Sequence, residues 1–151
     1  MSEFNNNTEN LLKQTRELLL ENKSLSDSDI RMYNPLVLAY VGDSVYDTFI
    51  RTILVSNGSI QVNKLHKRSI KFVSAKAQAE ITEQLYNILT EDEQDIVRRG
   101  RNTKSNSVPK NADMNDYRYA TGFEALIGYL YLIGNTKRLM EIFGIISKME
   151  R

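Results

Sequence analysis

The sequence predicts an all-α protein, and three observations support this fold class. Apolar residues recur at spacings of three and four along most of the 151 residues, the pattern of helices that bury one face. Residues that begin and end helices stand at the edges of these stretches, as with Asn34-Pro35 before one run and Asn57-Gly58 after it. No stretch has a convincing strand pattern, and no segment is repeated.

Length and composition narrow the class of protein. A chain of 151 residues is expected to form one domain with a real core, in which residues 1–30 make an N-terminal helix and a linker. No cysteine is present, which excludes disulfides and cysteine zinc sites. Arg51 interrupts the most apolar run and the N-terminus lacks a signal-peptide pattern, so we expect a cytoplasmic protein without a membrane partner. The net charge of +1 means that any nucleic-acid surface is local.

The first third of the chain predicts two helices. An amphipathic helix that ends near Asn22 is indicated by Leu11, Leu12, Thr15, Leu18 and Leu19. The polar stretch Ser24–Asp29 is expected to be a linker. The apolar run Pro35–Val55 then predicts a helix of about twenty residues that is buried on most sides, with Tyr40 and Tyr46 as packing groups.

Further helices are predicted in order along the rest of the chain. A third is marked by Ile60, Leu65 and Ile70, and a fourth runs from about Ser74 to Leu89 with Ala75, Ala79, Ile81, Leu85 and Ile88 facing inward. Thr90 and Glu93 form a capping box that opens a short helix to about Arg99. A long polar loop covers 101–116, and Asp116 is expected to cap a helix that ends before Gly134. Thr136 opens the last helix, whose apolar face has Leu139, Met140, Ile142, Phe143, Ile145 and Ile146.

Two acidic residues stand out within apolar helices. Asp43 follows Gly42 in Leu38-Ala39-Tyr40-Val41-Gly42-Asp43-Ser44-Val45, and Glu124 lies between glycines in Thr121-Gly122-Phe123-Glu124-Ala125-Leu126-Ile127-Gly128. A buried carboxylate is costly unless something compensates it, and a glycine inside a helix costs about 1 kcal/mol against alanine. Such a glycine usually lets another group approach closely. If the two helices pack together, Asp43 and Glu124 form a site suited to Mg²⁺ or Mn²⁺, although a buried pair neutralised by arginines is the alternative.

These two segments resemble the acidic helices of ribonuclease III catalytic domains. Leu38–Val45 resembles the signature helix of that family, and 123–128 resembles its second acidic helix. The family's other two acids fall where this chain has Ala39 and Thr121. Both replacements and the short length resemble the Mini-III ribonucleases, the branch without a double-stranded-RNA-binding domain. The resemblance covers about residue 34 to the C-terminus.

The resemblance implies a ribonuclease III-type endonuclease domain that forms a helical homodimer, with two active sites facing one RNA-binding valley. It implies a Mg²⁺-dependent endoribonuclease, with Mn²⁺ as a substitute, that hydrolyses double-stranded RNA and leaves 5′-phosphate ends. The expected catalytic and metal-binding residues are Asp43 and Glu124. The expected biological substrate is the 23S ribosomal RNA precursor of the large subunit, and a ribosomal protein is a candidate assisting partner.

Other residues are weaker candidates for the metal site. Asp47 lies one turn after Asp43 and could add a ligand, but pairing with Arg51 is favoured. The Thr121 hydroxyl could bond a water of the metal shell. The number of metal ions stays open. The dimer face also stays open, with the apolar face of the Asp43 helix and the region of Tyr129 and Tyr131 as candidates.

Basic and polar residues in and before the long loop predict the RNA-binding surface. These are Arg98, Arg99, Arg101, Asn102, Lys104, Ser105 and Lys110. Cations neutralise phosphates, and amides and hydroxyls bond phosphate and ribose oxygens, although a plain solvated loop is the alternative. A second candidate group comprises Lys64, His66, Lys67 and Arg68, for which RNA contact and a plain solvated face both stay open. Exposed aromatic stripes typical of single-strand binding are absent from the sequence pattern, which favours a duplex substrate.

Two other functions remain open at this point. One is a non-catalytic dimeric module that binds double-stranded RNA during ribosome assembly, for which Ala39 and Thr121 are the best support. The other is a helical metal-dependent phosphohydrolase that acts on small molecules, against which the basic loop and the lack of a glycine-rich phosphate cradle count.

Overall fold

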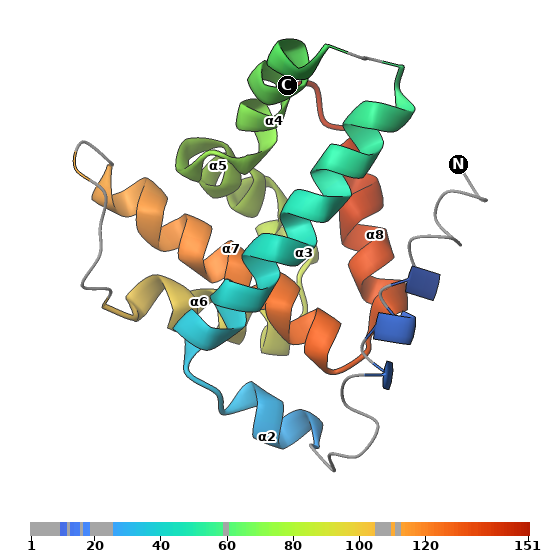
Figure 1. Ribbon diagram of the computed structural model, residues 1–151. Helices are drawn as coiled ribbons and strands as arrows, with labels where there is room; N and C mark the ends of the chain where they lie inside the picture. The colour runs from blue at the N-terminus through green and yellow to red at the C-terminus, as the bar shows by residue number, and fades with distance from the viewer. Residues whose placement is uncertain are drawn as a thin grey trace.

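The computed structural model describes residues 10–11, 13–15, 17–18, 26–58, 61–104, 110 and 113–151. Its helices are α2 (Asp27–Arg31), α3 (Pro35–Ser56), α4 (Val62–Val73), α5 (Ala75–Leu85), the short 3₁₀ helix η1 (Tyr86–Ile88), α6 (Glu91–Asn102), α7 (Met114–Leu132) and α8 (Thr136–Ser147). No strand occurs in these ranges, which confirms the all-α prediction. The helix α3 crosses α7 at the centre, with α4 and α5 towards one end of α3, α6 beside α7, and α8 behind (Figure 1).

Glycines let α3 and α7 cross with their backbones in contact. A Cβ added at Gly42 would lie 1.7 Å from the Glu124 carbonyl oxygen, and one at Gly128 would lie 1.9 Å from the Leu38 carbonyl oxygen. Real Cβ atoms do not approach other atoms so closely, so only glycine fits at both positions. The expectation that Gly42 allows a close approach is therefore confirmed, and the group that approaches it is the backbone of Glu124 itself.

A second glycine pair brings α6 against α7. A Cβ at Gly100 would lie 2.7 Å from the Cα of Gly122, and a Cβ at Gly122 would lie 2.5 Å from the Val97 carbonyl oxygen. The helix α7 is thus held closely by α3 and by α6. This explains why α7 is buried along most of its length and why its polar residues are set in fixed positions.

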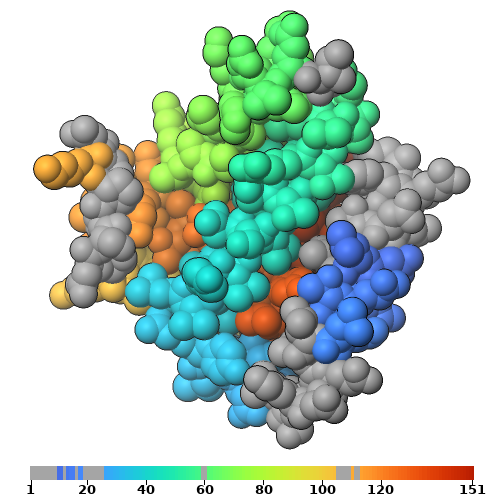
Figure 2. Space-filling view, viewed as in Figure 1, coloured from blue at the N-terminus to red at the C-terminus, as the bar shows by residue number. Residues whose placement is uncertain are grey.

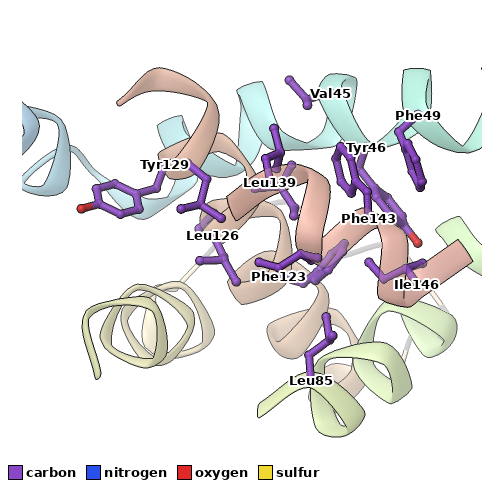
Figure 3. Packing of buried hydrophobic residues seen from close by; sticks show 14 of the residues in the cluster. Val45, Tyr46, Phe49, Leu85, Phe123, Leu126, Tyr129, Leu139, Phe143 and Ile146 are labelled. Carbon is purple, nitrogen blue, oxygen red and sulfur yellow. The ribbon is translucent and has the colours of Figure 1, made fainter. Parts of the chain in front are cut away.

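Aromatic rings fill the core beside this crossing (Figure 3). The ring of Tyr46 meets Phe123 edge to face with centroids 4.8 Å apart, and Phe49 stacks on Phe143 at 4.1 Å. Tyr46 is fully buried, and its hydroxyl donates a hydrogen bond of 2.9 Å to the Phe72 carbonyl. Tyr46 is therefore a packing group as predicted, and it joins α3 to the end of α4.

Capping residues set the helix boundaries largely as expected. The Asn34 side chain accepts from the Leu36 N–H with Pro35 as the first helical residue, and Thr90 and Glu93 form a complete capping box. The helix α3 ends before Gly58, which has φ of 86°. The expected cap at Asp116 is wrong, because Asp113 caps α7 by accepting from two backbone N–H groups. The loop is correspondingly shorter, since α6 also continues to Asn102.

Several predictions about exposure and linkers are wrong. A capping box between Ser26 and Asp29 begins α2 where a linker was expected. Ile88 is 47% exposed because the chain leaves α5 through a 3₁₀ turn that ends the helical spacing. Of the first predicted helix, the described residues of 10–18 are helical, whereas Leu12 and Leu19 lie outside the described part.

The helix α3 is not buried on most sides. Its outer face is open in the space-filling view, and Tyr40 is 81% exposed there instead of packing (Figure 2). The described helices include none that is both long and apolar enough to cross a membrane.

Candidate active site

Asp43 lies at the middle of α3 on the exposed side of the helix. The expected burial of this residue is wrong, because α7 packs against the preceding residue, Gly42, about 100° away around the helix, and leaves the Asp43 side chain exposed. The carboxyl group is nevertheless partly covered. This partial burial, and secondarily the negative charge of Asp47, raise the pKa of Asp43 above its ordinary value.

Glu124 occupies the facing position on α7 and is more deeply placed than Asp43. The backbone contact between Gly42 and Glu124 fixes these residues as neighbours across the helix crossing. Burial, together with the negative charge of Asp43, raises the pKa of Glu124 to about 8. The two carboxyl groups therefore repel each other when both are ionised.

No cation of the described chain compensates this pair. The Arg and Lys side chains that form ion pairs within the described ranges contact other acids, so the alternative of a pair neutralised by arginines fails there. Burial and the charge of Asp43 raise the pKa of Glu124, an environment that a divalent cation would stabilise, and carboxylate oxygens suit Mg²⁺ and Mn²⁺.

The ligand set offered by the described side chains is small. Nowhere in 26–58, 61–104 and 113–151 do three or more His, Asp or Glu side chains gather in a metal-binding arrangement. Asp43 and Glu124 thus fit a hard cation whose remaining ligands are water or substrate oxygens, as Mg²⁺ prefers.

Three further residues near the two acids are poor metal ligands, because two of them bond to protein groups and the third has no ligand atom. Asp47 forms an ion pair of 3.0 Å with Arg51, the arrangement that the sequence favoured. Thr121 is buried, and its hydroxyl donates 3.0 Å to the Tyr117 carbonyl, so the oxygen retains only acceptor capacity. Ala39 is buried and provides no ligand.

Gln78 of α5 is a residue of the site that the sequence reasoning missed. Its side chain is only 1% exposed, and it lowers the pKa of the Glu124 carboxyl against the larger raising effect of burial. The Nε2 atom donates 3.1 Å to the Val73 carbonyl. A signal was available, because Gln78 is the polar member of a helix face that also contains Ala77, Ile81 and Leu85.

The cations predicted for RNA binding fall into two groups. Arg98, Lys104 and Lys110 are exposed, as is Asn102, and they lie at or beyond the end of α6. Arg99 is instead half-buried and donates to the carbonyls of Arg31 and Tyr33, which fastens α6 to the α2–α3 junction. Arg98 also pairs with Asp95, and Ser105 lies outside the described residues.

Arg101 lines a cavity of about 620 Å³ between α5, α6 and α7. Its guanidinium donates 3.3 Å to the Tyr119 hydroxyl and lies 5.4 Å from the centre of that ring. Three acids also line the cavity, namely Glu80, Glu83 and Asp116. Their charges make this cavity a poor phosphate site and leave the exposed end of α6 as the more suitable surface.

The second basic group lies on α4, away from α6. Lys64, His66, Lys67 and Arg68 are all exposed, and His66 borders a cavity of about 180 Å³ with Arg51 and Leu65. None of the four forms an ion pair with another described residue. They are therefore available to solvent or to a ligand.

The chain is similar to a known family of proteins over most of its length. Residues 36–135 match the family model described as the Ribonuclease III domain. A Mini-ribonuclease 3 of Thermoanaerobacter sp. (strain X514) is 53% identical over 124 residues, which cover 82% of this chain and 87% of that relative. A Mini-ribonuclease 3 of Clostridium tetani is 50% identical over 128 residues, covering 84% and 85% respectively.

The fold has a counterpart among solved structures. The crystal structure of protein FN1578 from Fusobacterium nucleatum superposes with a TM-score of 0.71 at 32% sequence identity. The match covers 80% of this chain and 96% of that protein.

Proposed function

This chain belongs to the ribonuclease III family as an endoribonuclease of the Mini-ribonuclease 3 type, and we propose that it cleaves double-stranded RNA in a Mg²⁺-dependent reaction centred on Asp43 and Glu124. The observation that carries the proposal is the contact of Gly42 with the Glu124 backbone. It places two acids side by side without a compensating cation among the described residues. The pair has no evident structural use, because the charge of Asp43 raises the cost of ionising Glu124.

The two carboxylates would hold Mg²⁺ jointly. The bound ion supplies activation of a water molecule and neutralisation of charge on the scissile phosphate. Asp43, which is exposed, faces the side from which RNA approaches, and Glu124 lies behind it in the helix crossing. The backbone contact between Gly42 and Glu124 keeps both carboxylates in place during the reaction. Hydrolysis leaves a 5′-phosphate and a 3′-hydroxyl.

Exposed cations support a duplex RNA substrate. Arg98, Lys104 and Lys110 can neutralise phosphates, and Asn102 can bond ribose or phosphate oxygens. The wide minor groove of A-form RNA displays the 2′-hydroxyls that such groups contact. The α4 cations Lys64, Lys67 and Arg68, with His66, would form a second RNA contact separate from this surface. We further propose that the biological substrate is the 23S ribosomal RNA precursor, processed in the cytoplasm.

Exposed apolar side chains on α3 support a homodimer. Val37, Tyr40 and Val55 are 50%, 81% and 60% exposed on the same helix as Asp43, with exposed Ser44, Thr48 and Arg51 between Tyr40 and Val55. Exposed apolar groups on an outer face commonly mark a protein interface. Pairing of two copies through this face of α3 would give one particle with two cleavage sites, one for each strand of a duplex. Tyr129 is buried in the core, which leaves the α3 face as the better candidate.

Cleavage of a long RNA duplex tests the proposal. The natural chain is incubated with duplex in Mg²⁺, and binding is measured separately in Ca²⁺. Asp43→Asn should abolish cleavage while it retains binding, because the exposed carboxylate is removed without a change of shape. Asp47→Asn is the matched control, since that acid lies one turn away and is paired with Arg51, and it should retain most activity.

Each alternative outcome has a definite meaning. Binding without cleavage by the natural chain in Mg²⁺ and in Mn²⁺ would refute the catalytic proposal. Equal loss in Asp47→Asn and Asp43→Asn would refute the assignment of the site to the Asp43 and Glu124 pair. Binding that does not weaken as salt increases would refute a duplex substrate held through its phosphates.

A further inference from the structure

The helix α4 carries a row of cations that we call the cationic stripe. It consists of Lys64, Lys67, Arg68 and Lys71, which are all exposed. Their spacing of i, i+3, i+4 and i+7 places them on one face of the helix, over about 10 Å of its length. Like charges at these spacings repel, and Val62–Val73 contains no acid that would relieve the repulsion. The stripe therefore works against the helix that carries it.

Packing holds α4 only weakly. None of its 12 residues is buried, and Leu65, Phe72 and Val73 meet the core as partly buried groups. A helix of this length is marginal without tertiary contacts. Contacts other than packing are therefore needed to give α4 a fixed position.

Side chains of α3 and α5 bond the C-terminal end of α4. The last four carbonyls of an α-helix have no partner within the helix. The Phe72 carbonyl accepts a hydrogen bond of 2.9 Å from the Tyr46 hydroxyl, and the Val73 carbonyl accepts one of 3.1 Å from the Gln78 amide. Tyr46 and Gln78 are 0% and 1% exposed, so both donors are set firmly in the core.

Arg151 provides a third side-chain donor at the same end. Its guanidinium donates to the Lys71 carbonyl and forms an ion pair of 2.6 Å with Glu80 of α5. The cation also lies where the helix dipole is negative. The fourth carbonyl, that of Ile70, accepts from the Ser74 N–H. All four terminal carbonyls of α4 thus have donors, and three of these donors are side chains from outside the helix.

Bonds at this one end determine where the cationic stripe lies. The helix α4 is about 18 Å long, so a tilt of about 10° about its C-terminal end would move the other end by about 3 Å. This displacement is as long as a hydrogen bond, and it would separate Lys64 from a phosphate that it contacts. The stripe can match the phosphates of a stiff duplex only if the tilt is prevented.

We propose that Tyr46, Gln78 and Arg151 are positioning residues, which fix α4 so that its cationic stripe meets phosphates of the duplex RNA bound at Asp43 and Glu124. The inference rests on the proposed function, because it concerns how the same substrate is held. It also gives the Tyr46 hydroxyl a role. A phenylalanine ring would fill the same space in the core without the cost of burying a polar group.

The salt dependence of duplex RNA binding in Ca²⁺ tests the inference. The variants are Tyr46→Phe and Arg151→Met, alone and combined, which remove donors to α4 and leave the four cations of the stripe in place. The combined variant should bind RNA about three- to tenfold more weakly, and the slope of log affinity against log salt should fall by about one to two phosphate contacts. Each single variant should show part of this loss, which keeps the test valid if the combined variant folds poorly.

Arg138→Met is the matched control. Like Arg151, Arg138 pairs with an acid, Glu93 at 2.8 Å, and donates to a backbone carbonyl, that of Ile88 at 2.8 Å, but it does not touch α4. The control therefore removes the same charge and the same kinds of bond at another place. It should lower the free energy of unfolding and leave the RNA affinity and the salt slope of the folded protein unchanged.

A chain without the cationic stripe separates positioning from a general loss of stability. In a background with all four stripe residues replaced by alanine, Tyr46→Phe with Arg151→Met should cause no further loss of RNA affinity. An equal loss in that background, an equal loss in Arg138→Met, or natural affinity of the combined variant would overturn the inference. Natural affinity of the background itself would also overturn it, while the proposed function would stand. If the natural chain fails to bind duplex RNA, the proposed function fails, and the inference with it.

Discussion

Replacement of Gly42 by alanine is predicted to destabilise the protein strongly, although alanine is the better helix former. In an exposed helix interior the change would stabilise by about 1 kcal/mol. Here the new Cβ would lie 1.7 Å from the Glu124 carbonyl oxygen and 2.7 Å from the Gly128 nitrogen. Ordinary carbon–oxygen contacts are about 3.3 Å or longer, so α3 and α7 would have to separate by roughly 1.5–2 Å.

The expected cost follows from what must move. One extra methylene in a packed core typically costs about 1–3 kcal/mol, occasionally more. The atoms in the way of Gly42 are backbone atoms, which cannot rotate aside, so we expect a net loss of about 3 kcal/mol in the free energy of unfolding. This is a large fraction of the total stability of a typical domain. The same separation would pull Asp43 away from Glu124 and weaken Mn²⁺ binding.

Urea denaturation of Gly42→Ala and of the control Gly144→Ala tests this reasoning. Gly144 lies inside α8, and a Cβ there would meet nothing within 4 Å, so its replacement should stabilise the protein by up to about 1 kcal/mol. Opposite signs for the two variants are the expected result. Equal stability of Gly42→Ala and the natural chain, with Mn²⁺ binding intact, would refute the close crossing of α3 and α7.

Three further predictions concern ionisable groups. The pKa of Glu124 is raised from 4.5 to about 8, so the folded chain keeps a proton that the unfolded chain releases. Without metal, the free energy of unfolding should therefore fall between about pH 4.5 and 8, and Mg²⁺ should reverse the fall. A flat denaturation profile over that range would contradict the repulsion. Arg138→Met leaves buried Glu93 without its ion pair of 2.8 Å and should lower the free energy of unfolding, measured by urea denaturation, by about 3 kcal/mol. A loss below about 1 kcal/mol would show that the ion pair is dispensable. Lys104→Ala should reduce the salt dependence of RNA binding by about one phosphate contact. Arg99→Ala should lower the free energy of unfolding and leave the salt dependence unchanged. The reverse result would assign phosphate binding to Arg99 and a structural role to Lys104.

The glycines and acids of the site could be predicted from the sequence because each is costly in an apolar helix. Gly42 gives up helix propensity and the more deeply placed Glu124 gives up hydration, and such losses are retained only where another contact requires them. The crossing of α3 and α7 is that contact. The helices themselves followed from apolar spacing and from caps such as Asn34 and Thr90, which act within one turn of the chain.

Features that depend on partners distant in the sequence could not be predicted in this way. The guanidinium of Arg99 donates hydrogen bonds to backbone carbonyls 66 and 68 residues away in the sequence, although its position in a basic run favoured RNA contact. The exposure of Asp43 and Tyr40 depends on which face of α3 is covered by α7, and an almost continuous apolar run does not reveal that face. Gln78 was missed because its effect on the pKa of Glu124, 46 positions later in the chain, depends on the packing of α5 against α7.

The position of a bound metal ion tests the central claim most directly. Crystals of the natural chain would be soaked in Mn²⁺ and the ion located by its anomalous scattering. A peak in contact with carboxylate oxygens of both Asp43 and Glu124 is the predicted result, with water completing the shell. A fully occupied Mn²⁺ elsewhere, with these two carboxylates bonded only to protein or solvent, would contradict the account.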